Sequence, residues 1–436
     1  MCKEGYKMTG LGCLPEDWEV ISMNQILEKY NRKSFPISEE KIASVGKGTV
    51  YPRKEIYYNK KVKTNAPMLH LYPFSIVFGL GSNEISYGFN YDKECWVSPA
   101  YHGFIVKRSI IDYDFLKYIF EQYKKIWSKI YLIQGVRNGK QINWGGFLSV
   151  FLPLPPFDEQ KRIAETLKHI EDDIKETEQK IMKAKELKKA FLKKLLTEGI
   201  GHTEFKETEI GRIPKDWQVV KLGDVVEEFI RGVSYNKNAI NWESNKGIPV
   251  LRATNLEDIY QINIDQSKLV WLNPNQIVVK KEQYIQSDDI IIVTSSGSKE
   301  KVGRITLVKK DYSERYAIGA FLGIIRLKDS VEVSYVFFWL LSNVFRKYIE
   351  NTVSGTNINN LRKEHLTNFL LPLPPLPEQK KIAEILQRID NYIIDLEKSL
   401  NLKKQLFKAM TNELVTGKIR LNKEQYNEIV KSLQQS

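Results

Sequence analysis

The sequence has few cysteines and no long apolar segment. Its 436 residues contain three cysteines, Cys2, Cys13 and Cys95, an odd number without clustering. This pattern predicts neither a disulfide framework nor a zinc site, and the five histidines are scattered without ligand spacing. No apolar run reaches 18 residues and no signal peptide is recognisable, so we expect a cytoplasmic protein without membrane contact.

Motifs that would mark an enzyme are also missing. There is no phosphate-binding G-x-x-x-x-G-K-S/T, no G-x-S-x-G, no H-E-x-x-H and no paired C-x-x-C. Leu154-Pro155-Pro156-Phe157 resembles the N-P-P-F motif of amino-methyltransferases, whose Asn side chain accepts a hydrogen bond from the target amine. Leu154 cannot accept such a bond, and neither can Leu373 in the second copy. We therefore expect no catalytic residue, no metal and no cofactor.

Positive charge exceeds negative charge, but not evenly along the chain. The net charge of +13 favours a polyanionic partner, most often a nucleic acid. Residues 1–151 carry a net charge of +7, whereas residues 201–370 carry only +2. If the second segment binds a polyanion, its basic residues must gather on one face.

An internal repeat organises the sequence. Residues 152–197 open L-P-L-P-P-F-D-E-Q-K-R-I-A-E, and residues 371–416 open L-P-L-P-P-L-P-E-Q-K-K-I-A-E, without a gap between the copies. The prolines predict stiff, non-helical connectors at 152–156 and 371–375, each followed by a long helix. Two copies of a unit this long predict a tandem repeat of about half the chain.

Both predicted helices carry a heptad seam, which is typical of a coiled coil. The seam positions are Ile163, Leu167, Ile170, Ile174, Thr177, Ile181, Ala184, Leu187/Lys188, Phe191 and Leu195, and then Ile382, Leu386, Ile389, Ile393, Leu396, Leu400, Lys403, Phe407, Met410 and Leu414. We expect the two helices to pair antiparallel within the chain and give a pseudo-twofold molecule. The alternative is that each helix packs on its own neighbouring domain or pairs between chains.

A tryptophan-containing segment opens each half. Pro15, Asp17 and Trp18 match Pro214, Asp216 and Trp217, and we expect both tryptophans to be core anchors. The rest of each half predicts an α/β (α+β) domain. Its strand-like runs are 75–78, 104–106, 248–251, 290–293, 304–308 and 322–327, and its helix-like stretches are 114–131 and 334–348.

Loops that combine glycine with polar and basic residues are the candidate recognition surfaces. Asn and Gln can pair with an adenine edge, Arg and Lys with guanine or phosphate, and a Ser-Gly loop after a strand can hold a phosphate. A solvated surface turn is the alternative for any one loop. The candidates are Tyr101, His102, Gln134, Arg137, Asn138, Lys140, Gln141 and Asn143 in the first half, and Ser296, Ser298, Lys299, Thr356, Asn357, Asn359, Asn360, Arg362 and Lys363 in the second.

These features together resemble the specificity subunit of type I restriction-modification systems. The resemblance rests on Leu152–Glu165 and Leu371–Glu384, on the Pro/Trp segments, and on Asp289–Ser298 and Val97–His102. It implies two target recognition domains (1–151 and 201–370), two spacer helices with proline lead-ins (152–200 and 371–420), and a tail (421–436) in which we expect a short helix at 424–433.

The resemblance also implies partners. Each recognition domain would bind one half of a split double-stranded DNA target, while the helices fix the spacer and dock two modification subunits that carry the methyltransferase chemistry. Restriction subunits with endonuclease and translocase activity would join them. The competing hypotheses are a non-catalytic coiled-coil adaptor joining two protein-binding domains and an enzyme acting alone, which the missing motifs oppose.

Overall fold

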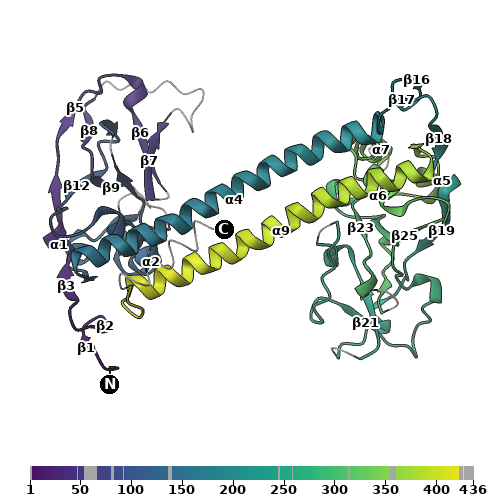
Figure 1. The fold of residues 1–436 in the computed structure, drawn as a ribbon. Helices are drawn as coiled ribbons and strands as arrows, with labels where there is room; N and C mark the ends of the chain where they lie inside the picture. Colours follow the sequence, from purple (N-terminus) through teal and green to yellow (C-terminus); the bar gives the residue numbers. More distant parts are fainter. Residues whose placement is uncertain are drawn as a thin grey trace. The chain divides into compact units, whose positions relative to one another are not determined.

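The computed structural model describes residues 2–46, 48–53, 66–79, 83–91, 93–135, 140–243, 246–257, 259–312, 315–353, 360–421 and 426. The chain divides into two compact units, Met1–Gln179 with Lys398–Ser436, and Lys180–Glu397. Each unit contains one α/β domain and a part of both long helices, α4 (Phe157–Thr197) and α9 (Leu376–Val415) (Figure 1). None of the helices within the described residues combines the length and the apolar content that a membrane crossing needs.

The first unit is built on a six-stranded sheet in the order β4-β12-β9-β10-β7-β6, beside a three-stranded sheet β11-β8-β5. Helix α2 (Tyr113–Tyr131) packs its apolar residues into the core with the larger sheet. The strands are β1 (Tyr6–Thr9), β2 (Gly12–Pro15), β3 (Glu19–Ser22), β4 (Leu27–Tyr30), β5 (Lys33–Ser34), β6 (Ala43–Gly46), β7 (Gly48–Pro52), β8 (Met68–Leu71), β9 (Ser75–Phe78), β10 (Tyr87–Asn90), β11 (Cys95–Val97), β12 (His102–Val106), β13 (Leu132–Gln134), β14 (Lys140–Ile142) and β15 (Phe151–Leu154); the short helices are α1 (Met23–Ile26) and α3 (Trp144–Leu148).

The second unit repeats this plan with a four-stranded sheet β19-β25-β22-β23 and a three-stranded sheet β21-β20-β24. Its strands are β16 (Phe205–Thr208), β17 (Gly211–Pro214), β18 (Gln218–Lys221), β19 (Val226–Arg231), β20 (Ile248–Leu251), β21 (Val270–Leu272), β22 (Ile290–Val293), β23 (Ile305–Leu307), β24 (Ala317–Ile318), β25 (Leu322–Leu327) and β26 (Leu370–Leu373). Its helices are α5 (Leu222–Val225), α6 (Val333–Leu340), α7 (Asn343–Val353) and α8 (Lys363–Thr367).

The structure confirms the predicted fold class, and it also shows two features that the sequence did not indicate. The proline lead-ins are short strands, β15 and β26, which pair antiparallel with β3 and β18. The stretch expected as one helix at 334–348 is two helices, α6 and α7. Trp18 and Trp217 are fully buried, as expected of core anchors.

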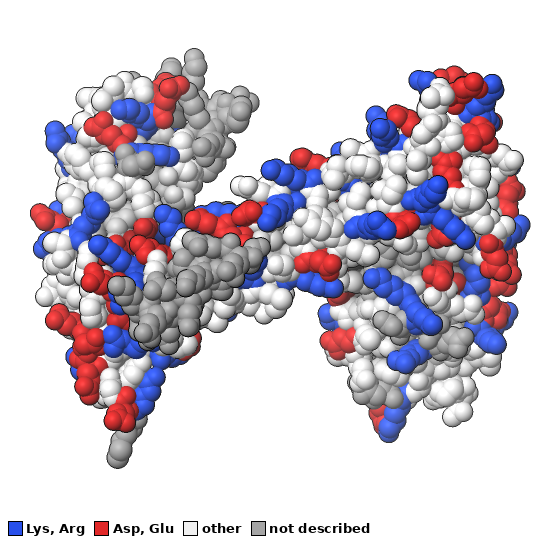
Figure 2. Space-filling model, viewed as in Figure 1, with Lys and Arg blue, Asp and Glu red and all other residues white. Residues whose placement is uncertain are grey.

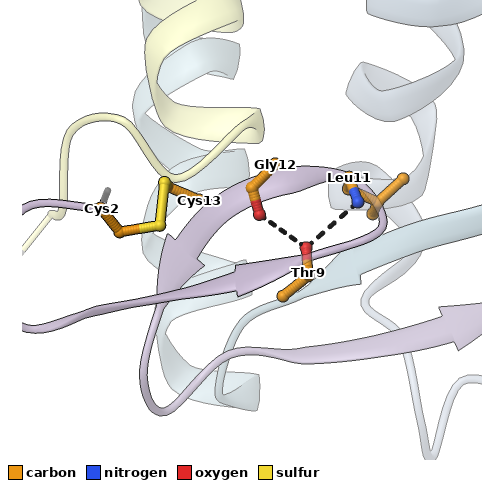
Figure 3. Close-up of a disulfide and its surroundings, with 5 residues drawn as sticks. All are labelled: Cys2, Thr9, Leu11, Gly12 and Cys13. Atoms are coloured by element: carbon orange, nitrogen blue, oxygen red, sulfur yellow. Dashed lines mark hydrogen bonds between the residues drawn. A yellow bond between two sulfur atoms is a disulfide. The ribbon is translucent and has the colours of Figure 1, made fainter.

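The three cysteines include one disulfide, so the expectation drawn from their number and spacing was wrong. Cys2 and Cys13 are bonded beside the β1–β2 hairpin (Figure 3). The hairpin folds the chain back on itself, and this brings together two cysteines that lie 11 residues apart in the sequence. The Thr9 hydroxyl fixes the turn, because it donates to the Gly12 carbonyl and accepts from the Leu11 amide. Cys95 is free and buried.

The long helices pair antiparallel within each unit. In the first unit, the Lys403 ammonium on α9 lies 2.6 Å from an Asp173 carboxylate oxygen on α4 and donates to the Thr177 hydroxyl at 3.0 Å. In the second unit, the buried Asp390 carboxylate on α9 pairs with Lys188 on α4 and accepts from the Tyr260 hydroxyl at 2.9 Å. Lys188 therefore holds the seam position, whereas Leu187 is exposed. Polar pairs at two seam positions restrict the helices to one register.

These seam pairs yield a stability prediction. Asp390→Ala leaves the partly buried Lys188 charge and the Tyr260 hydroxyl without their acceptor, and we expect a loss of about 3 kcal/mol in the free energy of unfolding. The control is Glu397→Ala, which breaks the exposed pair with Lys185 and should cost less than about 1 kcal/mol. Urea unfolding of the full chain measures both variants. Equal losses would contradict a special role for the seam pair.

Candidate nucleic-acid interface

Two candidate loops of the second unit meet at the end of its central strand. Strand β22 ends at Val293 and leads into the Ser-Gly loop, Thr294–Lys299. The Leu361 amide donates to the Thr294 carbonyl at 2.7 Å, and Ser295 bridges Asn360 in antiparallel fashion. The predicted residues Ser296 and Asn360 thus belong to one surface, although about 60 residues of chain separate them.

A cavity lies on either side of this junction. The first, of about 450 Å³, is lined by Arg231, Thr294, Asn360, Arg362 and Lys363. The second, of about 610 Å³, is lined by Tyr235, Arg252, Thr254, Ser295, Ser296, Gly297 and Phe321. Hydroxyls, an amide and cations thus gather at one end of the sheet, and these are the groups that bind phosphates and base edges.

Three cations and one carboxylate, that of Glu364, line the first cavity. Among the described residues, Arg231, Arg362 and Lys363 form no ion pair. Arg326, on the same sheet, instead makes two hydrogen bonds of 2.9 Å to the buried Asp289 carboxylate. The loop cations are therefore free to meet an anion. On the face that Figure 2 shows, positive and negative side chains are interspersed, so the electrostatic signal is local.

Two other predicted residues of the second unit lie in the part of the Ser-Gly loop that follows Gly297, outside both cavities. Ser298 and Lys299 follow the cavity-lining part of the loop and line neither cavity. The Ser298 amide donates to the Ser296 hydroxyl within the loop. The Arg346 guanidinium of α7 donates to the Lys299 carbonyl, so this end of the loop is attached to α7. Lys299 is exposed and can reach solvent.

In the first unit the candidate loop is a β-hairpin. Strands β13 and β14 pair Gln134 with Lys140 and Ile133 with Gln141, and the predicted residues Gln134, Lys140 and Gln141 are exposed. Asn143 ends the hairpin, where its side-chain oxygen accepts from the Gly146 amide and caps α3. This side-chain oxygen therefore already accepts a hydrogen bond within the protein.

The hairpin meets the second candidate position of the first unit through Trp144. The rings of His102 and Trp144 lie 4.7 Å apart, and the Lys29 ammonium lies 5.9 Å from the Trp144 ring. Burial, and then the positive charges of Lys29 and Lys33, lower the pKa of His102. Since this pKa falls below its ordinary value, the imidazole is neutral at pH 7 and can donate from one nitrogen while the other accepts.

Five predicted residues cannot be placed. Arg137, Asn138, Thr356, Asn357 and Asn359 lie outside the described residues. Conversely, the structure adds residues that sequence reasoning missed. Arg252 directly follows β20, which the sequence predicted, so a basic residue at a predicted strand end was the available signal there. Arg231 ends β19, a strand that the sequence analysis did not predict. Lys29 and Phe321 gave no comparable signal.

One cluster of potential metal ligands occurs among the described residues. His202, Asp216 and Glu378 bring their ligand atoms within 4.8 Å of one another. The His202 ring bridges the two carboxylates, at 2.8 Å from Glu378 and 3.4 Å from Asp216. In the first unit the Arg420 guanidinium binds the matching pair, Asp17 and Glu159. The recurrence of a basic group at this position favours an ion-pair role for the cluster.

Comparisons with known proteins agree with these features. A family model described as the type I restriction modification DNA specificity domain matches residues 15–186 and 214–406. The type I restriction enzyme MjaVIII specificity subunit of Methanocaldococcus jannaschii is 30% identical over 96% of this chain and 97% of its own length. The MjaX specificity subunit of the same organism is 28% identical over the same shares.

A solved structure shows the same fold. The crystal structure of the type I restriction-modification system S subunit from M. genitalium matches with a TM-score of 0.56. The match covers 91% of this chain and 96% of that chain, at 14% identity. At that identity the likeness speaks for the fold alone.

The environment of His102 generates a prediction. Lys29→Ala removes a positive charge that lowers the pKa of His102, so we expect this pKa to rise. An NMR titration of the imidazole carbon-bound protons measures it. Lys41→Ala serves as the control, because Lys41 is paired with Glu94 at 3.5 Å and does not act on His102. An unchanged His102 pKa in Lys29→Ala would show that the lysine charge does not reach the imidazole.

Proposed function

The chain belongs to the type I restriction modification DNA specificity family, and from this premise we propose that each of its two α/β domains binds one half of a split duplex DNA target. The observation that carries this proposal is the structural repeat. Hairpin β1–β2 and hairpin β16–β17 have the same register, as Tyr6 opposite Pro15 and Phe205 opposite Pro214 show. Both units also carry hydrogen-bonding and cationic side chains beside their larger sheets, such as His102 and Lys29 in the first unit and Ser296 and Arg231 in the second.

We place the recognition domains at residues 1–151 and 201–370. The spacer segments are then 152–200 and 371–420, followed by the tail 421–436. Of that tail, the structure describes Leu421, which is buried in the core of the first unit, and Tyr426, whose hydroxyl donates to Glu165 at 2.7 Å. The rest, including most of the short helix expected at 424–433, lies outside the described residues.

The chain would select DNA without catalysing a reaction. Two modification subunits would supply methyl transfer, and restriction subunits would supply cleavage and translocation. The outer faces of the long helices support docking, because they expose apolar side chains that the helix seam does not use. These are Met182 and Leu187 on α4, and Leu402 and Leu406 on α9. An adaptor for two proteins would need no cations at the strand ends, and this argues against the alternative.

If the chain binds DNA, its affinity should fall as the salt concentration rises, and specific cations should account for part of that fall. Each phosphate contact contributes about −0.9 to the slope of log affinity against log salt. Replacing Arg231, Arg362 and Lys363 together by alanine should make the slope about two to three units shallower and weaken binding to all sequences alike. Equilibrium binding to duplex DNA at several salt concentrations, with the modification subunits present, measures it.

The matched control for the salt series is Lys215→Ala. Lys215 is exposed and paired with Glu204 at 2.9 Å, away from both cavities, so its loss should leave the slope unchanged. If the wild-type complex fails to bind duplex DNA at low salt, the proposed function is wrong.

A second prediction concerns the helices as a ruler. Four residues inserted in each long helix, after Gln179 and before Lys398, add about 6 Å and about 40° of rotation. One base pair of DNA adds about 3.4 Å and about 35°, so the rotation matches one additional base pair. We expect the spacer to lengthen by about one base pair while both half-sites stay the same. Methylation mapping measures this, and an unchanged spacer would contradict the ruler.

A further inference from the structure

The two recognition sheets are in the same register at their centres. In the first unit, Gly103 on β12 lies opposite Val77 on β9 and Tyr30 on β4. In the second, Gly323 on β25 lies opposite Ile292 on β22 and Arg231 on β19. Residues two positions before these glycines are therefore equivalent. They are Tyr101 and Phe321, both aromatic, and the sequence repeat did not align them.

Phe321 lines the cavity of about 610 Å³ in the second unit. Its carbonyl accepts from the Thr294 amide at 2.9 Å, so its backbone is tied to the start of the Ser-Gly loop. Its side chain is 66% exposed, and Arg252 and Ser296 line the same cavity. Single exposed apolar side chains are common, so exposure alone marks no site. The fixed backbone, the polar cavity and the equivalent aromatic together distinguish this one.

Tyr101 occupies the matching place at the end of β9. A Cβ atom added to Gly79, the residue after β9, would lie 3.2 Å from the Tyr101 ring. The ring thus covers the end of the central strand closely. Next to it, the His102 ring lies 4.7 Å from the Trp144 ring at an angle of 60°, where strand β14 ends. In both units an aromatic ring therefore lies beside the loops that carry the candidate DNA-binding residues.

We propose that Phe321 and Tyr101 determine sequence specificity, each for the half-site that its own unit binds. This inference rests on the proposed function and says which side chains read the bases. A phenylalanine ring offers no hydrogen bond, so Phe321 recognises an apolar feature of a base edge, the C5-methyl group of thymine in the major groove. Tyr101 carries a hydroxyl as well, on a partly buried ring that also packs against the core of its unit. The neighbouring cations, Arg252 and Arg362, bind phosphates and hold the register without carrying sequence information.

The test uses the full chain in complex with its modification subunits and a pool of duplexes with randomised half-sites. Phe321→Ala should reduce the preference for thymine at one or two adjacent positions of one half-site by about tenfold, with the other half-site unchanged. Tyr101→Ala should relax only the opposite half-site. Binding to duplexes without the target should stay close to that of the wild type, because the phosphate contacts remain.

Two further variants keep the test decisive. Phe151→Ala makes the same change at a ring that is 59% exposed on β15, and it should leave both half-sites unchanged. Phe321→Ile keeps an apolar contact and should retain the thymine preference. If the alanine variant does not fold, this isoleucine variant still tests the inference. An unchanged preference in Phe321→Ala, or an equal loss of affinity for all sequences, overturns the inference. Failure of the wild-type complex to bind DNA would instead reject the proposed function.

Discussion

In each unit, one glutamate at the start of a long helix joins the parts of the unit. Glu159, in the first turn of α4, is buried and accepts from the Trp18 indole at 3.1 Å and from Arg420 at 2.7 and 2.9 Å. Glu378, in the first turn of α9, accepts from the Trp217 indole at 3.0 Å and is paired with His202 at 2.8 Å. In each unit one carboxylate therefore joins the tryptophan that opens the domain, the beginning of one long helix and the chain that follows the other.

The geometry around each glutamate depends on close approach. Gly417 and Gly199 follow the ends of α9 and α4 with positive φ angles of 71° and 66°. A Cβ atom at Gly417 would come within 3.0 Å of Trp18, and one at Gly199 within 2.6 Å of Trp217. The adjacent glutamines extend the same junction. Gln160 and Gln379 accept from the Asp112 and Glu332 amides, where α2 and α6 begin. The repeated Glu-Gln pair thus fixes the domain core on the helices of its unit.

Sequence reasoning found the features that follow from local pattern. The heptads predicted the helices, the apolar runs predicted β9, β20 and β22, and the repeat predicted two similar units. It missed features that depend on contacts far apart in the chain. Nothing local indicates that Arg420 and His202 serve the same position, since the residues around them align poorly. Arg231 was overlooked for the same reason, because only the folded sheet brings the end of β19 to the cavity beside the Ser-Gly loop.

The two units share the junctions that position their sheets but differ in the side chains at the strand ends. The Glu-Gln junctions join each domain core to the helices of its unit, and none of these contacts involves the strand ends beside the candidate loops. Tyr30 and Arg231 occupy one register position, and Tyr101 and Phe321 another, with different side chains on the same frame. The second unit's segment 201–370 carries a net charge of only +2. Among the described residues, Arg231, Arg362 and Lys363 line one cavity without an ion pair, and a sum over the segment hides this local excess. What matters for recognition is therefore where the unneutralised charges lie.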